Sequence, residues 1–273
     1  MVAPAVIDLL LSLDWLNALA GLLVGTVVGI TGVGGGSLMS PILIMLFGVA
    51  PATAVGTDLW FAAITKFAGS IIHHRQASAD TAIVGWLCLG SIPAAILTLF
   101  FLFHEGGHQV KNGLIITMLG SMLIVTSVAT LFRKRLVSAM VDTDNEERAR
   151  RFVRYQPLLT ALAGAILGTL VTLTSVGAGA LGATMLLMLY PLRLTARRLV
   201  GTDIMHAVPL TLVGGIGYLL VGSVDLKLLA TLLIGSIPGI IVGARLTRIL
   251  NEGFVQRCLA VILFLAGLKM VLA

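Results

Sequence analysis

A glycine-rich stretch that occurs twice constrains this chain more than any other feature. Residues 25–41 read GTVVGITGVGGGSLMSP, and residues 168–184 read GTLVTLTSVGAGALGAT. Shorter identical motifs follow in the same order in both halves of the chain: VGTD at 55–58 and 200–203, and GSIP at 90–93 and 235–238. A repeat of about 130 residues is too long for a solenoid unit, so the sequence predicts a protein built from two similar halves.

The composition restricts the chain to a membrane. Hydrophobic residues make up 58% of the sequence and charged residues only 11%, whereas a soluble domain carries roughly 25% charged residues. In a soluble protein the net charge of +6 would suggest nucleic acid as a partner. In a membrane protein it indicates lysines and arginines in cytoplasmic loops. We therefore expect the lipid bilayer as a partner, and no nucleic acid.

Each half contains the same series of five apolar segments. The last three of each half are long enough to cross a hydrocarbon core of about 30 Å. A segment of roughly 12 residues, as in the second of each half, reaches only about 18 Å as a helix. The first two segments of each half are therefore either one long span interrupted by glycines or a hairpin that enters and leaves on one side. The segments are 15–31, 37–48, 52–72, 81–103 and 111–132, then 157–174, 180–190, 199–221, 226–244 and 254–272.

Basic residues favour the hairpin. The stretch 133–156 is rich in arginine and should face the cytoplasm, since lysine and arginine concentrate on that side. A single span would place the arginines of 193–198 and 245–257 outside, whereas a hairpin places them inside. We therefore expect an all-α polytopic membrane protein with two inverted-topology repeats, each a glycine-broken helical hairpin followed by three transmembrane helices. Five full crossings per half would also be an odd number and would give the same inverted relation, so the distribution of charge does not exclude this alternative.

The same argument divides the chain. We expect a first membrane repeat at 1–132, a basic cytoplasmic linker at 133–156 and a second membrane repeat at 157–273. Residues 1–14 contain no lysine or arginine, which places the N-terminus outside and predicts no cleaved signal. Thr143 and Glu146 form a capping-box pattern, so 146–155 is either a short surface helix or part of a solvated tether.

The glycine turns are candidate anion sites. A hairpin from each side of the membrane brings its turn near the midplane, where the second arm starts with free N–H groups and the positive end of its dipole. Helix N-termini bind anions, and glycine lets a ligand approach the backbone. The alternative is that these glycines only permit a tight turn and close packing. The candidate residues are Gly34, Gly35, Gly36, Ser37, Gly177 and Gly179.

Three charged residues lie inside apolar segments. Asp58 and Asp203 occupy matching positions in the two halves, and a carboxylate in the membrane needs a partner or a wet cavity. Lys66 could reach toward the cytoplasm, neutralise an anionic substrate, or pair with Asp58. We treat the two aspartates as candidates for proton coupling and Lys66 as a candidate for substrate binding.

Neighbouring polar residues extend this set. His206 follows Asp203 by one turn and either relays protons or is a hydrogen-bonded packing residue. Thr57 and Thr202 precede the aspartates and could offer hydroxyls to the substrate or bond one helix to another. The histidines have no convincing set of further metal ligands, and the glycines lack nucleotide-binding spacing. We therefore predict no metal and no cofactor.

The motifs together resemble those of a known family. The sequence GxGGGS followed by a proline, the downstream GTDL and the loop HHRQASAD return as SVGAGA, GTDI and GSVD in the second half. In this respect the chain, from about residue 17 to 272, is similar to the sulfite exporter TauE/SafE family. The resemblance implies a multi-pass permease of the bacterial inner membrane that exports a small sulfur-containing oxoanion, such as sulfite, sulfoacetate, another organosulfonate or thiosulfate.

These observations predict a secondary transporter that works by alternating access, not an enzyme, with a small anion as substrate and a possible homo-oligomeric state. Two alternatives remain. One is an intramembrane enzyme acting on a lipid or a sulfur compound, although the chain has neither GxSxG nor HExxH. The other is a structural or assembly subunit, which would not need paired glycine turns.

Overall fold

The computed structural model describes most of the chain, namely residues 15–31, 36–73, 79–104, 108–141, 146–177, 179–190, 193–246 and 252–272. All regular structure in these residues is helical. The first half contains α2 (Trp15–Thr31), α3 (Gly36–Met45), α4 (Pro51–His73), α5 (Thr81–His104) and α6 (His108–Val141). The second contains α7 (Glu146–Thr174), α8 (Ala180–Leu189), α9 (Ala196–Leu220), α10 (Leu226–Leu246) and α11 (Glu252–Leu272).

The helices follow the apolar segments closely, because a segment that must satisfy its own backbone in lipid becomes a helix. The linker differs from the expectation. Instead of a separate short helix at 146–155, α7 runs without a break from Glu146 to Thr174, and α6 continues to Val141. Thr143, the other member of the capping-box pattern, lies outside the described residues.

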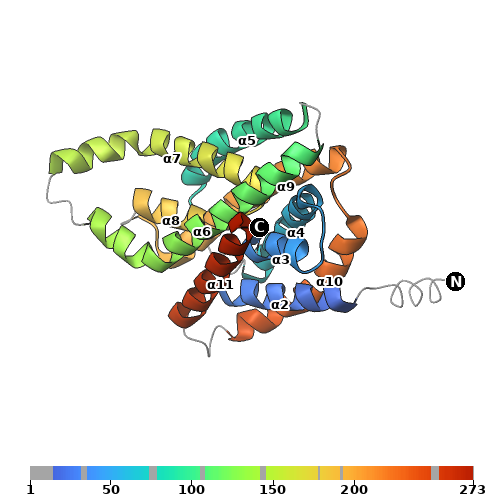
Figure 1. Ribbon diagram of the computed structural model, residues 1–273. Helices are drawn as coiled ribbons and strands as arrows, with labels where there is room; N and C mark the ends of the chain where they lie inside the picture. The colour runs from blue at the N-terminus through green and yellow to red at the C-terminus, as the bar shows by residue number, and fades with distance from the viewer. Residues whose placement is uncertain are drawn as a thin grey trace.

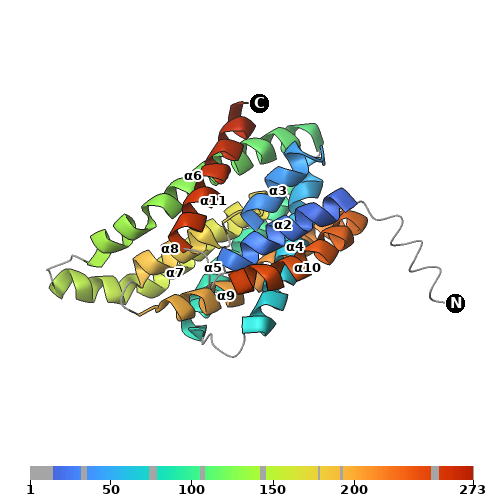
Figure 2. The same cartoon turned by 90° about the horizontal axis from the view of Figure 1, so that it is seen from below.

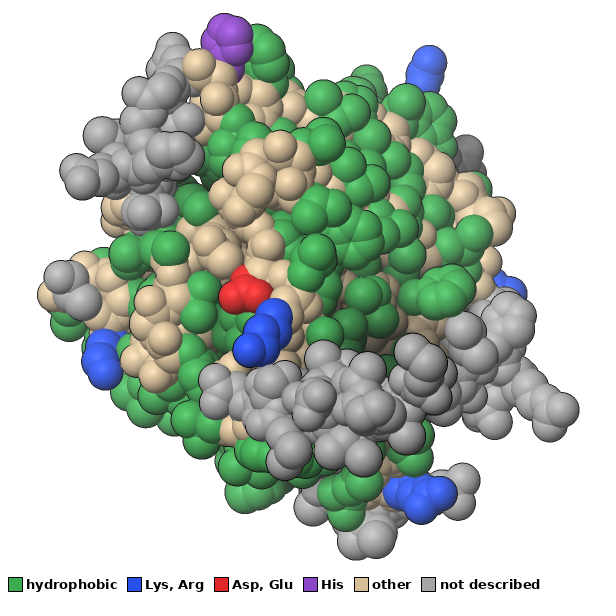
Figure 3. Space-filling model, turned by 90° about the vertical axis from the view of Figure 1, so that its right-hand side faces the viewer, with side chains coloured by type: hydrophobic (Ala, Val, Ile, Leu, Met, Phe, Trp, Pro, Cys, Tyr) green, Lys and Arg blue, Asp and Glu red, His purple; other side chains and the backbone are tan. Residues whose placement is uncertain are grey.

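The chain is a multi-pass membrane protein. Within the described residues six segments are long and apolar enough to cross a bilayer, one each in α5, α6, α7, α9, α10 and α11. Figure 3 shows one face of the molecule, on which many hydrophobic side chains lie at the surface beside a few basic, acidic and histidine side chains. At 10 residues each, α3 and α8 reach only about 15 Å and are too short to cross alone.

This set of six differs from the six expected crossings, the last three segments of each half, by one helix missing and one added. The first segment of the second half, in α7, belongs to it, whereas α4 does not. With 23 residues α4 is long enough to cross, but Asp58 and Lys66 lower its hydropathy. The helix that falls short of the apolar criterion is thus one of the two that contain the buried charges.

Each half packs into the other through glycine seams. In Figures 1 and 2, α2 lies alongside α10 and α5 lies alongside α7. A Cβ atom on Gly25 would lie 2.4 Å from the carbonyl oxygen of Ser236, and one on Gly168 would lie 2.3 Å from that of Ser91. Backbones this close leave no room for a side chain at these positions. Membrane helices use small residues such as glycine for this kind of close packing. Gly25 matches Gly168 and Ser91 matches Ser236 in the two halves, so the seams are reciprocal.

Helices at matching positions run in opposite directions where they meet. In the α4–α9 pair, Leu59 lies against Gly214, while Lys66, further along α4, reaches back to Asp203. In the α6–α11 pair, Gly120 packs on Gly267 and Ser127 donates a hydrogen bond to the carbonyl of Ala260. Both pairs are therefore antiparallel.

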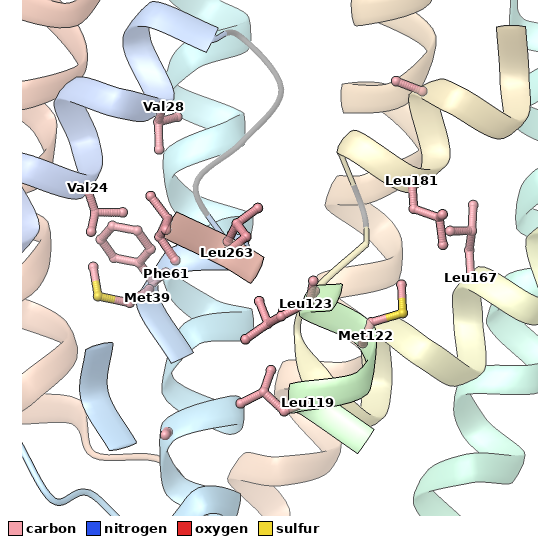
Figure 4. Close-up of a cluster of buried hydrophobic side chains, with 14 of the residues drawn as sticks. Val24, Val28, Met39, Phe61, Leu119, Met122, Leu123, Leu167, Leu181 and Leu263 are labelled. Atoms are coloured by element: carbon pink, nitrogen blue, oxygen red, sulfur yellow. The ribbon is translucent and has the colours of Figure 1, made fainter. Parts of the chain in front are cut away.

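One hydrophobic core joins the two halves. Figure 4 shows Val24 of α2, Met39 of α3 and Phe61 of α4 on one side of this cluster, and Leu167 of α7 and Leu181 of α8 on the other. Side chains from α6 and α11 lie between them: Leu119, Met122, Leu123 and Leu263. This core holds α3 and α8, the short helices that follow the glycine turns, within one packed unit.

Candidate functional site

The first buried carboxyl group lies at the start of a short helix. Asp58 of α4 is completely buried, and its Oδ2 accepts hydrogen bonds from the backbone N–H of Ser40 at 3.1 Å and the hydroxyl of Ser40 at 2.6 Å. Ser40 lies in the second turn of α3, just after the first glycine turn. An acidic side chain of the protein itself therefore packs against the second turn of α3.

The glycine turn of the second half approaches the same carboxyl group. Ser175 follows α7 directly, is buried, and has a positive φ of 58°. Its side chain lies near the Asp58 carboxyl group, and both Ser175 Oγ and Asp58 Oδ1 are buried without a hydrogen-bond partner. Asp58 thus lies between the short helix of one repeat and the glycine turn of the other.

The second buried carboxyl group is in an ion pair. Lys66 Nζ lies 3.3 Å from Asp203 Oδ2, and the two side chains are only 5% and 6% exposed. A Cβ atom on Gly182 would lie 3.0 Å from Asp203 Oδ1, so the first turn of α8 packs on Asp203 as α3 packs on Asp58. Ala183 replaces Ser40 in this half and has no hydroxyl to offer.

Lys66 therefore binds the aspartate of the other half, and not Asp58 as one of the sequence-based alternatives held. Eight positions separate Lys66 from Asp58, a rise of about 12 Å along a helix. Because α9 runs antiparallel to α4, the lysine ammonium meets Asp203 at this level. The cation thus neutralises one aspartate in the site and is not beside the other.

The histidine makes a buried hydrogen bond. His206 Nε2 lies 2.9 Å from Ser91 Oγ, so the ring of His206 is hydrogen-bonded to the first half of the chain. A serine next to a histidine is also what a hydrolase would need. Ser91, however, is completely buried in the α5–α7 seam, where its carbonyl oxygen would be 2.3 Å from a Cβ on Gly168.

The two threonines connect helices of different halves. Thr57 Oγ1 accepts a hydrogen bond from the N–H of Asp225 at 3.1 Å, and Thr202 Oγ1 accepts one from the N–H of Asp80 at 3.0 Å. Asp225 and Asp80 in turn accept from backbone N–H groups in the first turns of α10 and α5, as helix caps do. Both hydroxyls thus accept hydrogen bonds that connect the two halves.

One contact breaks this reciprocity. Arg193, in the loop after α8, lies 2.7 Å from Asp80 Oδ2. At the matching position of the first half the chain has Gly48, which has a positive φ of 64° and open space around it. An ion pair therefore joins the loops at one end of the molecule, and the described part of the other end has none at the corresponding position.

The structure describes only some of the glycines that were predicted to bind the substrate. Gly34 and Gly35 lie outside the described residues, Gly36 is the first residue of α3, and Ser37 is half-buried. Gly177 is buried with a φ of +111°, a conformation that favours glycine. Gly179 precedes α8, and no side chain caps that helix end.

Three serines of the site were missed by the sequence reading: Ser40, Ser91 and Ser175. A signal was present, since all three lie in or beside the repeated motifs. Serine in a membrane helix is common, however, and only the packing shows which hydroxyls meet an ionisable group. In the described residues no group of three His, Cys, Asp or Glu side chains could hold a metal ion.

Comparison with known proteins gives a consistent result. Residues 17–270 match the family model described as "Sulfite exporter TauE/SafE". A "Probable membrane transporter protein YjnA" of Bacillus subtilis is 40% identical over 259 residues, which cover 93% of this chain and 98% of that protein. A second B. subtilis protein, "Probable membrane transporter protein YdhB", is 28% identical over 90% of this chain and 95% of its own length. No solved structure matches the chain.

Proposed function

This chain belongs to the sulfite exporter TauE/SafE family, and from that premise we propose that it is a secondary transporter that exports a small sulfur-containing oxoanion across the bacterial inner membrane by alternating access. The substrates we propose are sulfite, thiosulfate, sulfoacetate or another organosulfonate. One observation carries the proposal for this chain. The short helices α3 and α8, each following a glycine turn, meet buried ionisable residues between the two halves.

This arrangement supports an anion site at the glycine turns. The first N–H groups of α8 have no side-chain cap, and such groups together with the helix dipole favour an anion. We assign backbone contacts to Gly34, Gly35, Gly36, Gly177 and Gly179, and hydroxyl contacts to Ser37, Thr57 and Thr202. Lys66, held by Asp203, supplies positive charge nearby. Asp58, Asp203 and His206 are the groups we assign to proton coupling.

The opposite directions of matching helices support the inverted relation of the halves. With α4 antiparallel to α9 and α6 antiparallel to α11, an odd number of crossings per half follows if all four helices span the membrane. The repeats then occupy 1–132 and 157–273, with the basic stretch 133–156 in the cytoplasm and the N-terminus outside. Inverted repeats with a site between them are a common architecture of secondary transporters.

A difference between the halves supports alternating access. The short helix α3 packs mainly against α4, whereas its counterpart α8 packs mainly against α6. Since the two halves have similar sequences, each arrangement is available in principle to the other half. Exchange of the two arrangements would give a second state in which the opposite side of the site opens.

The test is anion flux in proteoliposomes. We expect saturable uptake of labelled sulfite, thiosulfate or methanesulfonate by the wild type. Ser37→Leu should abolish this uptake, because the larger side chain occupies space at the first turn of α3, where we place the anion. The matched control is Ser121→Leu, the same change at an exposed position of α6, which should transport normally. Absence of flux for all three anions, with folded protein in the bilayer, would refute the proposal.

A further inference from the structure

The buried charges of the site do not balance. In the described part of the chain, the charged side chains buried inside the helices are Asp58, Lys66 and Asp203. Lys66 and Asp203 neutralise one another at 3.3 Å. Asp58 has no ion-pair partner there, and the turn residues 32–35 are Gly-Val-Gly-Gly, which bring no charge. An ionised Asp58 would leave a net negative site.

A negative site is a poor place for an anion. A carboxylate buried without a cation is strongly destabilised in a medium of low dielectric constant, and in practice such a group takes up a proton. A second anion beside it would add like-charge repulsion that is scarcely screened there. The site can therefore accept an anionic substrate only when Asp58 is neutral.

The geometry offers a place for the proton. Asp58 Oδ2 already accepts two hydrogen bonds from Ser40, whereas Asp58 Oδ1 is buried without a partner. The hydroxyl of Ser175, also buried and without a hydrogen-bond partner, lies near this carboxyl group from the other half. A proton on Oδ1 makes that oxygen a hydrogen-bond donor, and the unpartnered Ser175 hydroxyl is a candidate acceptor.

Among the described side chains on the helices packed against α4, no titratable group takes the place of this proton. Among the helices packed on α4, α9 contributes Asp203, already paired, and His206, bonded to Ser91. The segment α3 has no titratable side chain. The other titratable side chains whose burial the structure describes on the helices around α4 are exposed, apart from the buried Tyr218: Arg154, Tyr155, Arg198, Lys227 and Arg245.

We propose that Asp58 binds a proton together with each transported anion, so that proton and anion cross the membrane in the same direction. The proton comes from water on the loading side, forms the Oδ1–H bond and returns to water on the other side. This inference rests on the proposed transport function. A divalent anion carried with one proton still moves one negative charge, so an inside-negative potential continues to favour export.

The test uses thiosulfate, which stays fully ionised at neutral pH and carries no proton itself. Proteoliposomes with the membrane potential clamped at zero receive an external medium about one pH unit more acidic. For one proton per anion we expect about tenfold accumulation of thiosulfate, since one pH unit and a tenfold concentration ratio are equal driving forces. External alkalinisation, followed with a pH dye, should accompany uptake. A sodium gradient at constant pH should cause no accumulation.

The decisive variant is Asp58→Asn, which keeps the shape and removes the titration. It should lose accumulation driven by the pH gradient yet still exchange labelled for unlabelled thiosulfate. Asp225→Asn is the matched control: this residue caps α10, asparagine caps equally well, and accumulation should persist.

The outcomes separate the two proposals. Thiosulfate flux in the wild type without pH-driven accumulation or alkalinisation would overturn the role of Asp58 and leave the transporter standing. The same would follow if Asp58→Asn accumulated the anion as the wild type does, or if sodium drove the uptake. Lack of flux for every anion tested would instead refute the transport function. The alkalinisation measurement needs only the wild type, so it decides even if Asp58→Asn fails to fold.

Discussion

The ion pair between Lys66 and Asp203 is the residue-scale feature that shapes the rest of the site. Both side chains are almost fully buried, and burial removes hydration that is worth several kcal/mol for each ion. The pair is tolerable because each charge neutralises the other. It also uses the only lysine of α4, which is why the charge at Asp58 must be removed in another way.

At this scale we predict that Lys66→Met destabilises the folded protein. Loss of one partner leaves the Asp203 carboxylate buried without its ammonium, which typically costs 3–5 kcal/mol, as an order of magnitude. The melting temperature in detergent should fall markedly. The double variant Lys66→Met with Asp203→Asn removes both charges and should recover most of the loss. A single variant as stable as the wild type would show that the pair does not hold α4 and α9 together.

At the scale of whole helices, glycines form the contacts between the two halves. They line the α2–α10 pair and the α5–α7 pair, where larger side chains would keep the helices apart. Two apolar helices gain nothing from the hydrophobic effect when lipid is the alternative neighbour, so close backbone contact provides the attraction. Two glycines of the same helix can differ completely in how closely a neighbouring backbone approaches them. Gly90 of α5 packs on the backbone of Ala161, whereas Gly85 of α5 has open space around it.

We predict that alanine is not tolerated at the glycines of α5 and α10 that contact a neighbouring backbone, and is tolerated at a glycine of α5 that does not. Gly90→Ala would place its methyl group 1.8 Å from the carbonyl oxygen of Ala161, and Gly235→Ala would place its methyl group equally close to that of Ala18. Since both are backbone atoms that cannot turn away, each variant should reduce the yield of monodisperse protein strongly. Gly85→Ala should leave the yield unchanged. Equal yields for all three, measured by size-exclusion chromatography, would contradict the seam.

At the scale of the whole molecule, the reciprocal contacts fix how the halves relate. Thr57 bonds to Asp225 and Thr202 to Asp80, and matching helices meet antiparallel across the centre. The loops before α4 and after α9 should then lie on one face of the membrane, and the start of α7 on the other.

Cysteine labelling checks this orientation. In a background where Cys88 and Cys258 are replaced by alanine, Val221→Cys, in the loop after α9, should react with a membrane-impermeant maleimide added to intact cells whose outer membrane has been permeabilised. Tyr155→Cys, near the start of α7, should react only after the inner membrane is opened. Both native side chains are exposed, at 42% and 56%. The side of the membrane on which each cysteine lies, and not its burial in the protein, therefore determines whether the maleimide reacts with it. Labelling in the reverse order would invert the topology.

Much of this protein is determined by its sequence alone. The repeat of 25–41 at 168–184 predicts two halves, and the apolar segments predict the helices, because in a bilayer hydropathy and helix breaks act locally. The linker was less predictable, since α6 and α7 extend into it. Partner choice was not predictable: Lys66 and Asp203 are 137 residues apart and His206 and Ser91 are 115 apart. Only the packing of α9 against α4 and α5 decides that these groups meet, because such contacts depend on the relative rotation and direction of helices that lie far apart in the chain.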